Sequence, residues 1–361
     1  MRLFENIGLG PAYSKVFRQL ASPRSFDEGI VQFLEHRYGA AHILEPVETR
    51  QSNAFCALGD EPQMQSLWSA EHGLATRDLE EILLAQIEHH RTEVFYNLDP
   101  LRYGSAFVRR LPGCVKKTLC WRAAPSGNAD LSGYDLVVCN FPSILADWRE
   151  RGCRAEYFHP AVDPIMAEYV LGDRQIDVLF FGSYSRHHLA RAKVLDGVAQ
   201  LRGEWKIVYC LDASRSTQLA EAFPLASLGY FDKYRRPPAV VAVAQAPVWG
   251  RQAYELLGQA KIVLNGAIDM AGNDRGNMRC FEAMGCGALL LSDAGRYPDG
   301  MEDGKTFAAY QSPEEARSLA QNYLSDTEAR SRIARMGRET VNRLYNKSVQ
   351  WQRFNEIVAN M

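Results

Sequence analysis

The stretch Ala260–Asp293, AKIVLNGAIDMAGNDRGNMRCFEAMGCGALLLSD, decides the fold. An apolar run over 260–265 predicts a buried strand, and a helical pattern over 277–284 follows after a loop. A second apolar run over 288–292 predicts the next strand. Strand, loop, helix and strand in this order are typical of a parallel sheet with helices on its faces.

The loop inside this stretch is the first candidate site. Ligands of open α/β sheets bind at the carboxyl ends of the strands, and a helix N-terminus suits a phosphate. Arg275 and Arg279 add fork-shaped cations, and Glu282 can accept hydrogen bonds from a ribose diol. This order of groups predicts a site for a nucleotide diphosphate.

The same residues also have a purely structural interpretation. Asn277 is then an ordinary N-cap, and Arg279 and Glu282 form a surface pair three residues apart. The loop is long and carries three glycines, which favours a functional loop over a simple connector.

The alternation of short apolar runs and amphipathic stretches extends outward from this core. We expect strands over 1–7, 42–46, 93–98, 117–121, 134–139, 176–181 and 205–210. We expect helices from Ser14 and over 26–38, 78–90, 188–201 and 251–259, a helix opening at Ser312, and two more between 326 and 361. The polar stretch 51–67 is ambiguous. The proline-containing segment 156–164 predicts an extended connector between two domains.

These patterns divide the chain into three parts. We predict an N-terminal Rossmann-like domain over 1–165 and a C-terminal Rossmann-like domain over 166–340. The remaining residues 341–361 are expected to form a helix that packs back on the N-terminal domain.

Composition excludes several classes of protein. The chain has 361 residues, of which 47% are apolar and 23% charged, and these values are those of a globular protein. The net charge of −2 provides no overall basic field, so we expect no nucleic-acid partner. No apolar run is long enough to span a membrane, and no secretory signal is evident, so we expect a cytoplasmic protein.

Cysteine and histidine patterns predict no metal site. Eight scattered cysteines without a C-x2-C pair indicate reduced thiols rather than disulfides or a zinc ribbon. The pairs His89-His90 and His187-His188 stand next to each other, and adjacent side chains on a helix diverge by about 100°. A shared ion is therefore not expected, and we expect no cofactor.

The decisive stretch resembles the donor-binding core of GT-B glycosyltransferases. It is most similar to the CgeB-like (spore-maturation-type) members, relatives of the retaining group-1 enzymes. The resemblance spans about 156–345 and covers the first half of the chain only as a general pattern. The segments that carry it are FHPAVDP (158–164), DVLFFGS (177–183), AKIVLN (260–265), NMRCFEAMGCGALLLSD (277–293), YQSPEE (310–315) and SDTEARSRIARMGRETV (325–341).

The resemblance implies the GT-B fold, in which two Rossmann-like α/β domains face a cleft and the chain ends in helices. It also implies roles for two carboxylates. Glu282 matches the second glutamate of the family's E-x7-E motif, which grips the nucleotide ribose. The first glutamate of that motif, which contacts the donor sugar, falls on Asp274, a shorter carboxylate.

Further donor-binding residues are implied in two segments of the chain. Asn277, Arg279 and the adjacent Arg275 are expected at the donor phosphates or sugar. Gly182 and Ser183 match the glycine turn that admits the diphosphate. Arg186 is the expected phosphate cation, with Arg191 and Lys193 as rivals.

The N-terminal half is expected to hold the acceptor. Gly10, in the Gly8-x-Gly10 turn, and Trp121-Arg122, at a strand end, are acceptor-side candidates. Asp99 follows a predicted strand and is a candidate acceptor base, although it equally fits a helix N-cap.

The predicted function is transfer of a sugar from a nucleotide-sugar to a glycan, lipid-linked or small-molecule acceptor. Asp274, Arg279 and Asp99 are the candidate catalytic residues. The resemblance implies retention, the arginines favour metal-free catalysis, and peripheral attachment at the inner membrane face is compatible with this role. The alternatives are a nucleotide-sugar epimerase of the same fold and a non-catalytic sugar-nucleotide-binding protein. A dehydrogenase is disfavoured because no G-x-G-x-x-G follows a strand.

Overall fold

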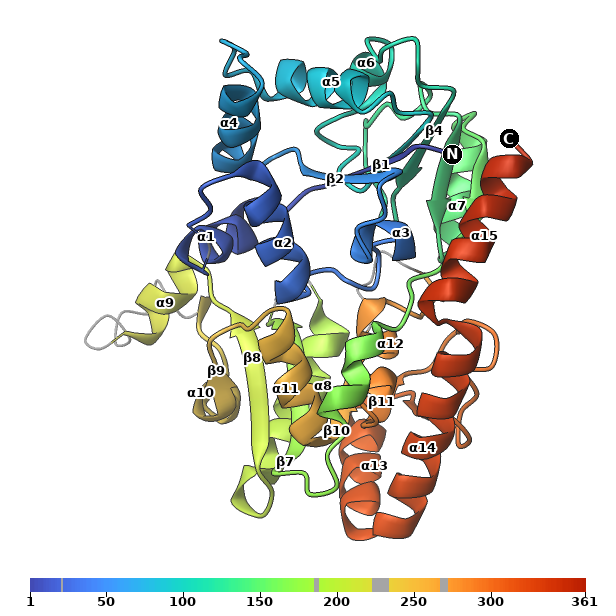
Figure 1. The fold of residues 1–361 in the computed structure, drawn as a ribbon. Coiled ribbons are helices and arrows are strands. Elements are labelled where there is room, and N and C mark those ends of the chain that lie inside the picture. Colours follow the sequence, from blue (N-terminus) through green and yellow to red (C-terminus); the bar gives the residue numbers. More distant parts are fainter. Residues whose placement is uncertain (21, 185–187, 223–233, 267–271) are drawn as a thin grey trace. The chain divides into compact units, whose positions relative to one another are not determined.

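The computed structural model describes the chain except residues 21, 185–187, 223–233 and 267–271 (Figure 1). The chain divides into two compact units. Unit 1 comprises Met1–Ala161 together with Tyr345–Met361, and unit 2 comprises Val162–Leu344. The domain ends predicted at 165 and 340 lie within a few residues of these divisions. The final helix belongs to unit 1, the unit on which it was expected to pack.

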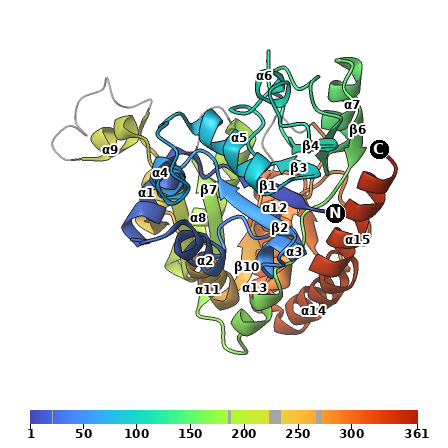
Figure 2. The same cartoon turned by 45° about the horizontal axis from the view of Figure 1, so that its top comes forward.

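Unit 1 is built on a parallel sheet with the strand order β2-β1-β3-β4-β5-β6 (Figure 2). Its strands are β1 (Leu3–Ile7), β2 (Ala54–Leu58), β3 (Val94–Asn97), β4 (Lys117–Trp121), β5 (Leu136–Cys139) and β6 (Ala155–Tyr157). Its helices are α1 (Gly10–Leu20), α2 (Phe26–His36), α3 (Glu45–Glu48), α4 (Pro62–Glu71), α5 (Leu79–His89), α6 (Ser105–Val108), α7 (Pro142–Glu150) and α15 (Lys347–Ala359). Helix α4 contacts both α2 and α5.

Two sequence predictions in unit 1 are wrong. The stretch 42–46 is not a strand, because Pro46 stands in the first turn of α3, where its fixed φ favours a helix. The edge strand is instead β2, within the segment left ambiguous, and all five of its residues pair with β1. The predicted connector 156–164 likewise begins inside β6, which pairs with β5.

Unit 2 has a second parallel sheet with the order β12-β11-β10-β7-β8-β9. Its strands are β7 (Ile176–Ser183), β8 (Ile207–Asp212), β9 (Ala244–Gln245), β10 (Ala260–Leu264), β11 (Leu289–Asp293) and β12 (Ala308–Tyr310). Its helices are η1 (Pro164–Tyr169), α8 (Leu189–Ala199), η2 (Gln200–Gly203), α9 (Arg215–Glu221), α10 (Pro238–Val243), α11 (Arg251–Gln259), α12 (Met278–Gly285), α13 (Pro313–Ser325) and α14 (Thr327–Leu344).

Each sheet has its own apolar core. In unit 1 the side chains of Phe4, Phe95 and Val137 lie among aromatic residues from the helices and loops. In unit 2 the strands pack against α8, α10, α13 and α14, and α13 and α14 lie side by side (Figure 1). Ser312 caps α13 by accepting from Glu315 N, as the sequence predicts. No described helix is both long and apolar enough to cross a membrane.

A buried charge cluster holds the last helix in unit 1. Lys347, at the start of α15, donates to the carbonyls of Ala40 and Ile43 and lies 3.5 Å from Glu48 Oε2. Glu5 on β1 is fully buried close by, and its Oε2 accepts from Leu44 N at 3.1 Å. Burial raises the pKa of Glu5 to about 8, and the Leu44 amide and Lys347 counter this only in part.

The raised pKa of Glu5 makes the stability of the protein depend on pH. The folded chain holds this proton more tightly than the unfolded chain, whose carboxyl has its ordinary pKa of 4.5, so stability falls as the pH rises toward 8. Between pH 6.5 and 8 we expect a loss of about 1.4 kcal/mol per pH unit at most. Glu5→Gln abolishes this slope in urea unfolding, whereas Glu88→Gln at an exposed position keeps it. Equal slopes in all three proteins would contradict the assignment.

Candidate functional site

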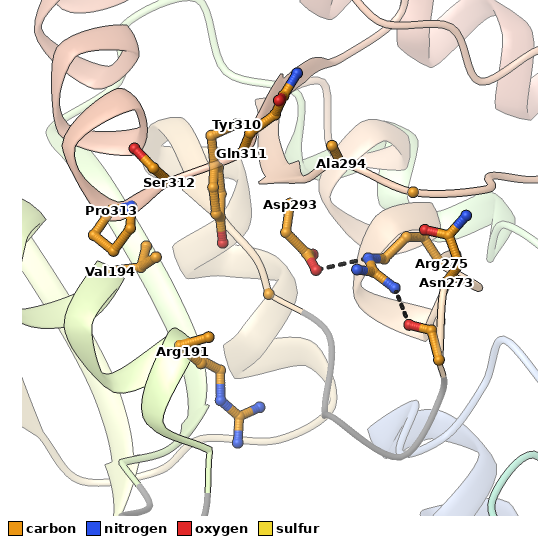
Figure 3. Close-up of a pocket in the computed structure, with 14 residues that line it drawn as sticks. Arg191, Val194, Asn273, Arg275, Asp293, Ala294, Tyr310, Gln311, Ser312 and Pro313 are labelled. Atoms are coloured by element: carbon orange, nitrogen blue, oxygen red, sulfur yellow. Dashed lines mark hydrogen bonds and ion pairs between the residues drawn. The ribbon is translucent and has the colours of Figure 1, made fainter.

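Unit 2 has a cavity of about 700 Å³ at the carboxyl edge of its sheet (Figure 3). The loops after β10, β11 and β12 line it together with the first turn of α8, which follows β7. Strands β7 and β10 are neighbours at the centre of the sheet, and the chain leaves them toward opposite edges. The cavity therefore lies at the topological switch point, where α/β sheets bind ligands.

The buried amide of Asn265 fixes the loops around this cavity. Its Nδ2 donates to Ser292 Oγ on β11 at 3.0 Å, and its Oδ1 accepts from Asn277 Nδ2 at 3.2 Å. Its backbone carbonyl accepts from the Tyr310 hydroxyl at 2.7 Å. Gly266 follows, and a Cβ there would lie 3.1 Å from that hydroxyl and 3.4 Å from Arg191 Cγ. The ends of β10, β11 and β12 and the start of α12 are thus tied to one residue.

A second tie joins the loop before α12 to the loop after β11. Asp274 is 1% exposed, and its Oδ1 accepts from Arg296 Nε at 2.7 Å. The backbones pair as well: Arg275 N donates to Arg296 O at 2.8 Å, and Arg296 N donates to Asn273 O at 2.7 Å. We call these contacts the 274–296 clasp. Gly295 is required there, because a Cβ would lie 2.7 Å from Asn273 O and Arg275 Cγ.

Among the described residues, three charged side chains line the cavity: Arg191, Arg275 and Asp293. Arg275 Nε lies 2.6 Å from Asp293 Oδ2, and these two side chains point toward each other in Figure 3. Arg191 reaches the cavity from the first turn of α8, on the other side. Burial raises the pKa of Tyr310 above its usual value; Asp293 raises it further, and Arg275 and Arg191 oppose the rise.

At this edge the N-cap side chains of two helices, among the described residues, make no capping bond. The Asn277 side chain does not cap α12, because its amide donates to Asn265, and His188 makes no capping bond to α8. The first N–H groups of both helices keep their donor capacity and their partial positive charge. The start of α13 differs, since Ser312 caps it.

Glu282 and Arg279, on α12, do not line this cavity. Glu282 Oε2 is 2.6 Å from Arg279 Nη1, and the Arg279 guanidinium lies 4.3 Å from the centre of the Phe181 ring at the end of β7. The carboxylate is 5% exposed, and burial raises its pKa while Arg279 lowers it and Asp163 raises it. The pair is therefore a shielded ion pair rather than the surface pair of the structural interpretation.

Unit 1 has a pocket of its own, of about 580 Å³, at the carboxyl ends of β1 and β3. Gly8, Gly10, Asp60 and Asp99 line it together with Arg102. Asp60 accepts from the N–H groups of Leu9 and Gly10 at 2.9 and 3.0 Å, which holds the loop after β1. Burial raises the pKa of Asp99, the nearby Asp60 raises it further, and Arg102, 3.7 Å away, lowers it.

Buried amide side chains at the ends of β1 and β3 hold the loops around this pocket. Asn6 Nδ2 donates to Asn97 Oδ1 at 2.9 Å, and Asn6 Oδ1 accepts from Gly59 N at 3.1 Å. The Tyr103 hydroxyl donates to Gly59 O at 2.6 Å. This network fixes the ends of β1, β2 and β3.

Comparisons with known proteins give one partial family match and several similar folds. Residues 209–356 match the family model described as glycosyl transferase-like. HepE of Anabaena, solved with UDP and glucose, is 12% identical, with 100% of each chain covered and a TM-score of 0.62. Sucrose-phosphate synthase of Thermosynechococcus elongatus is 13% identical over 78% of this chain and 76% of that chain, with a TM-score of 0.51.

A third solved structure, AviGT4, is described as a glycosyltransferase involved in avilamycin A biosynthesis. It is 13% identical over 99% of this chain and 96% of that chain, with a TM-score of 0.53. At these identities the structural likeness shows the fold alone. The chain has the GT-B fold of these glycosyltransferases, and its residues 209–356 resemble a glycosyl transferase-like family. No curated protein matches it in sequence.

The structure does not bring the predicted donor residues together around the cavity. Arg275 lines the cavity. Asp274 lies in the 274–296 clasp, Asn277 bonds to Asn265, and Arg279 and Glu282 form the shielded pair. Gly182 and Ser183 end β7, and Gly182 has a φ of 150°, which favours glycine. Arg186 lies outside the described residues.

The predicted acceptor-side residues are similarly divided. Gly10 and Asp99 line the pocket of unit 1. Trp121 and Arg122 do not line it; the Trp121 ring lies 4.5 Å from the His42 ring, and Arg122 donates to Ser126 Oγ. Arg122 nevertheless lies close enough to lower the pKa of Asp99.

Sequence reasoning did not single out Asp60, Asp293 or Tyr310. Asp293 and Tyr310 are the last residues of β11 and β12, so their places at strand ends were the available signal. Asp60 follows β2, the strand that the sequence prediction missed.

We expect that position 8 must be glycine, because any larger residue would overlap the Asp99 side chain. A Cβ at Gly8 would lie 2.8 Å from Asp99 Cβ and Cγ, so Gly8→Ala should destabilise the protein by about 1–3 kcal/mol through overpacking. Gly113→Ala is the matched control, because nothing lies within 4 Å of its added Cβ. Urea unfolding measures both variants. A Gly8→Ala protein as stable as the control would refute the contact.

Proposed function

We propose that this protein is a glycosyltransferase that moves a sugar from a nucleoside-diphosphate donor to a hydroxyl of its acceptor, with retention and without a metal ion. The observation that carries the proposal is the cavity at the switch point, lined by Arg191 and Arg275 beside two helix starts without side-chain caps. Such an arrangement suits a diphosphate. The related fold of HepE, which was solved with UDP and with UDP-glucose, supports the same donor class.

The chemical demand on the site is charge stabilisation. When the bond between the anomeric carbon and the diphosphate oxygen breaks, negative charge develops on the leaving diphosphate. Arg191 lines the cavity and the start of α8 adds N–H donors, so both can stabilise this charge. In the retaining reaction the acceptor oxygen bonds to the anomeric carbon on the face that the diphosphate leaves, and the acceptor proton passes to a phosphate oxygen.

The nucleoside is assigned to the neighbourhood of Glu282. Arg279 holds that carboxylate beside Phe181 at the end of β7, close to the predicted glycine turn. A carboxylate fixed in this way accepts hydrogen bonds from the two hydroxyls of a ribose.

The acceptor is assigned to the pocket of unit 1. Asp60 and Asp99 provide oxygen acceptors for hydroxyl groups, and Arg102 provides a donor. This suits a polyhydroxylated acceptor, such as a glycan, a glycolipid or a natural product.

The decisive experiment incubates the protein with UDP-glucose and other sugar nucleotides, with and without candidate acceptors. Acceptor-dependent release of nucleoside diphosphate supports the proposal. Interconversion of the sugar alone identifies an epimerase, and binding without turnover identifies a non-catalytic protein. Activity that is lost with EDTA and restored by manganese would contradict the metal-free reaction.

Arg191 is expected to bind the diphosphate. Arg191→Gln should weaken UDP binding about 10- to 100-fold, because a hydrogen bond to a charged group is worth about 1.5–3 kcal/mol. Lys193→Gln, on the exposed side of the same helix, is the matched control and should bind UDP as the parent does. Isothermal titration measures both. Equal loss in the two variants would indicate a general electrostatic effect and would remove Arg191 from the site.

Glu282 is expected to bind the ribose. Glu282→Gln keeps the volume but loses the charge, so UDP binding should weaken about 10-fold or more. The loss should be smaller for 2′-deoxyuridine diphosphate, which lacks one of the two hydroxyls. If the two nucleotides lose affinity equally, Glu282 acts only through Arg279 and the ribose assignment is wrong.

A further inference from the structure

Asp274, the carboxylate that the family motif assigns to the donor sugar, is bonded to Arg296 instead. Asp274 holds the position of the first E-x7-E glutamate, but it is almost fully buried and accepts from Arg296. It does not line the cavity. Its contacts join two loops rather than opening toward a ligand.

The 274–296 clasp decides where the next residue points. Backbone bonds on both sides of Asp274 fix the loop against Arg296, and the missing side chain of Gly295 lets the two backbones approach. Arg275 is thereby directed to the cavity side, where its Nε meets Asp293 Oδ2. The clasp thus aligns a charged pair that belongs to the cavity.

Asp293, and not Asp274, is the carboxylate that lines the cavity. It ends β11, lines the cavity, and keeps 23% of its side chain exposed while it is paired with Arg275. Together the two side chains present hydrogen-bond acceptors and donors with no net charge. Such a pair complements neighbouring hydroxyls of a neutral sugar. A sugar carboxylate would meet the Asp293 charge, with the Arg275 charge already neutralised.

We propose that Asp293, aligned by Arg275, binds the hydroxyls of a neutral glycosyl group on the donor, and that Asp274 is a positioning residue acting through Arg296. This inference rests on the proposed function, because it presumes that the cavity receives the donor. It assigns specificity for the sugar to Asp293, a residue outside the E-x7-E motif.

The first test separates the sugar from the nucleotide. Asp293→Asn should raise the KM for UDP-glucose at least 10-fold while the Kd for UDP stays within twofold of the parent. The parent should prefer UDP-glucose over UDP-glucuronate, and Asp293→Asn should reduce that preference. A variant that loses UDP and UDP-glucose equally, or that keeps the preference unchanged, overturns the assignment.

The second test concerns Asp274. If it acts through Arg296, Asp274→Asn and Arg296→Gln raise the KM for UDP-glucose by similar factors, and the double variant shows no further rise. Arg296→Lys, which keeps the charge, should recover part of the loss. If Asp274 contacts the sugar itself, Asp274→Asn raises the KM for UDP-glucose more than Arg296→Gln does. The rise in the double variant is then at least the product of the two single rises. KM and kcat are measured for every variant at a temperature at which circular dichroism shows that the variant is folded.

Failure of the underlying function gives a different result. A parent protein that binds neither UDP nor UDP-glucose refutes the donor site as a whole. A parent that binds both, with Asp293→Asn unchanged toward UDP-glucose, refutes only the role of Asp293.

Discussion

Buried amide side chains at the ends of central strands are the constraint on which both sites depend. A buried amide has two donors and an acceptor that must be satisfied inside the protein, so its partners are fixed in place. Asn265 meets this demand with Ser292 and Asn277, and thereby ties β10 to β11 and to the start of α12. Asn6 and Asn97 bond to each other in unit 1 and hold the ends of β1, β2 and β3. In each unit the loops around the pocket are therefore anchored to the sheet by polar contacts that apolar packing does not provide.

The same contacts determine the electrostatics of the cavity in unit 2. Because Asn277 donates to Asn265, it does not cap α12, and the N–H groups of that helix keep their donor capacity for a ligand. Arg275 is neutralised by Asp293, whereas Arg191 reaches the cavity from α8. Arg191 and the start of α8 on one side, and the neutral Arg275–Asp293 pair on the other, suit a donor with an anionic diphosphate and an uncharged sugar.

Local patterns predicted much of the fold because they depend on neighbours in sequence. The cap at Ser312 and the alternation of strand and helix over 260–293 were correct for this reason. Strand β2 was missed although its five residues, AFCAL, form an apolar run, because polar residues stand on both sides of this short run; its pairing with β1 identifies it. The site shows the same limit. Arg275 was predicted and lines the cavity, but the partner of Asp274 is a residue 22 positions away, which no local pattern reveals. Asp293 could be recognised as a site residue only once the 274–296 clasp was seen to place Arg275 beside it.

The shorter side chain at position 274 follows from this geometry. An aspartate places its carboxylate close to the backbone, where the loop is already paired with Arg296, and there the charge is compensated by a guanidinium. A glutamate would extend the carboxylate by one methylene and displace it from the Nε contact of 2.7 Å. Removing either partner would leave the other charge uncompensated, which is costly for the buried Asp274 and much less so for Arg296, which is half exposed. Asp274 therefore aligns the loop, and we assign the contact with the sugar to Asp293, the carboxylate that the loop aligns. Function in this fold follows the geometry of the site rather than the letters of the motif.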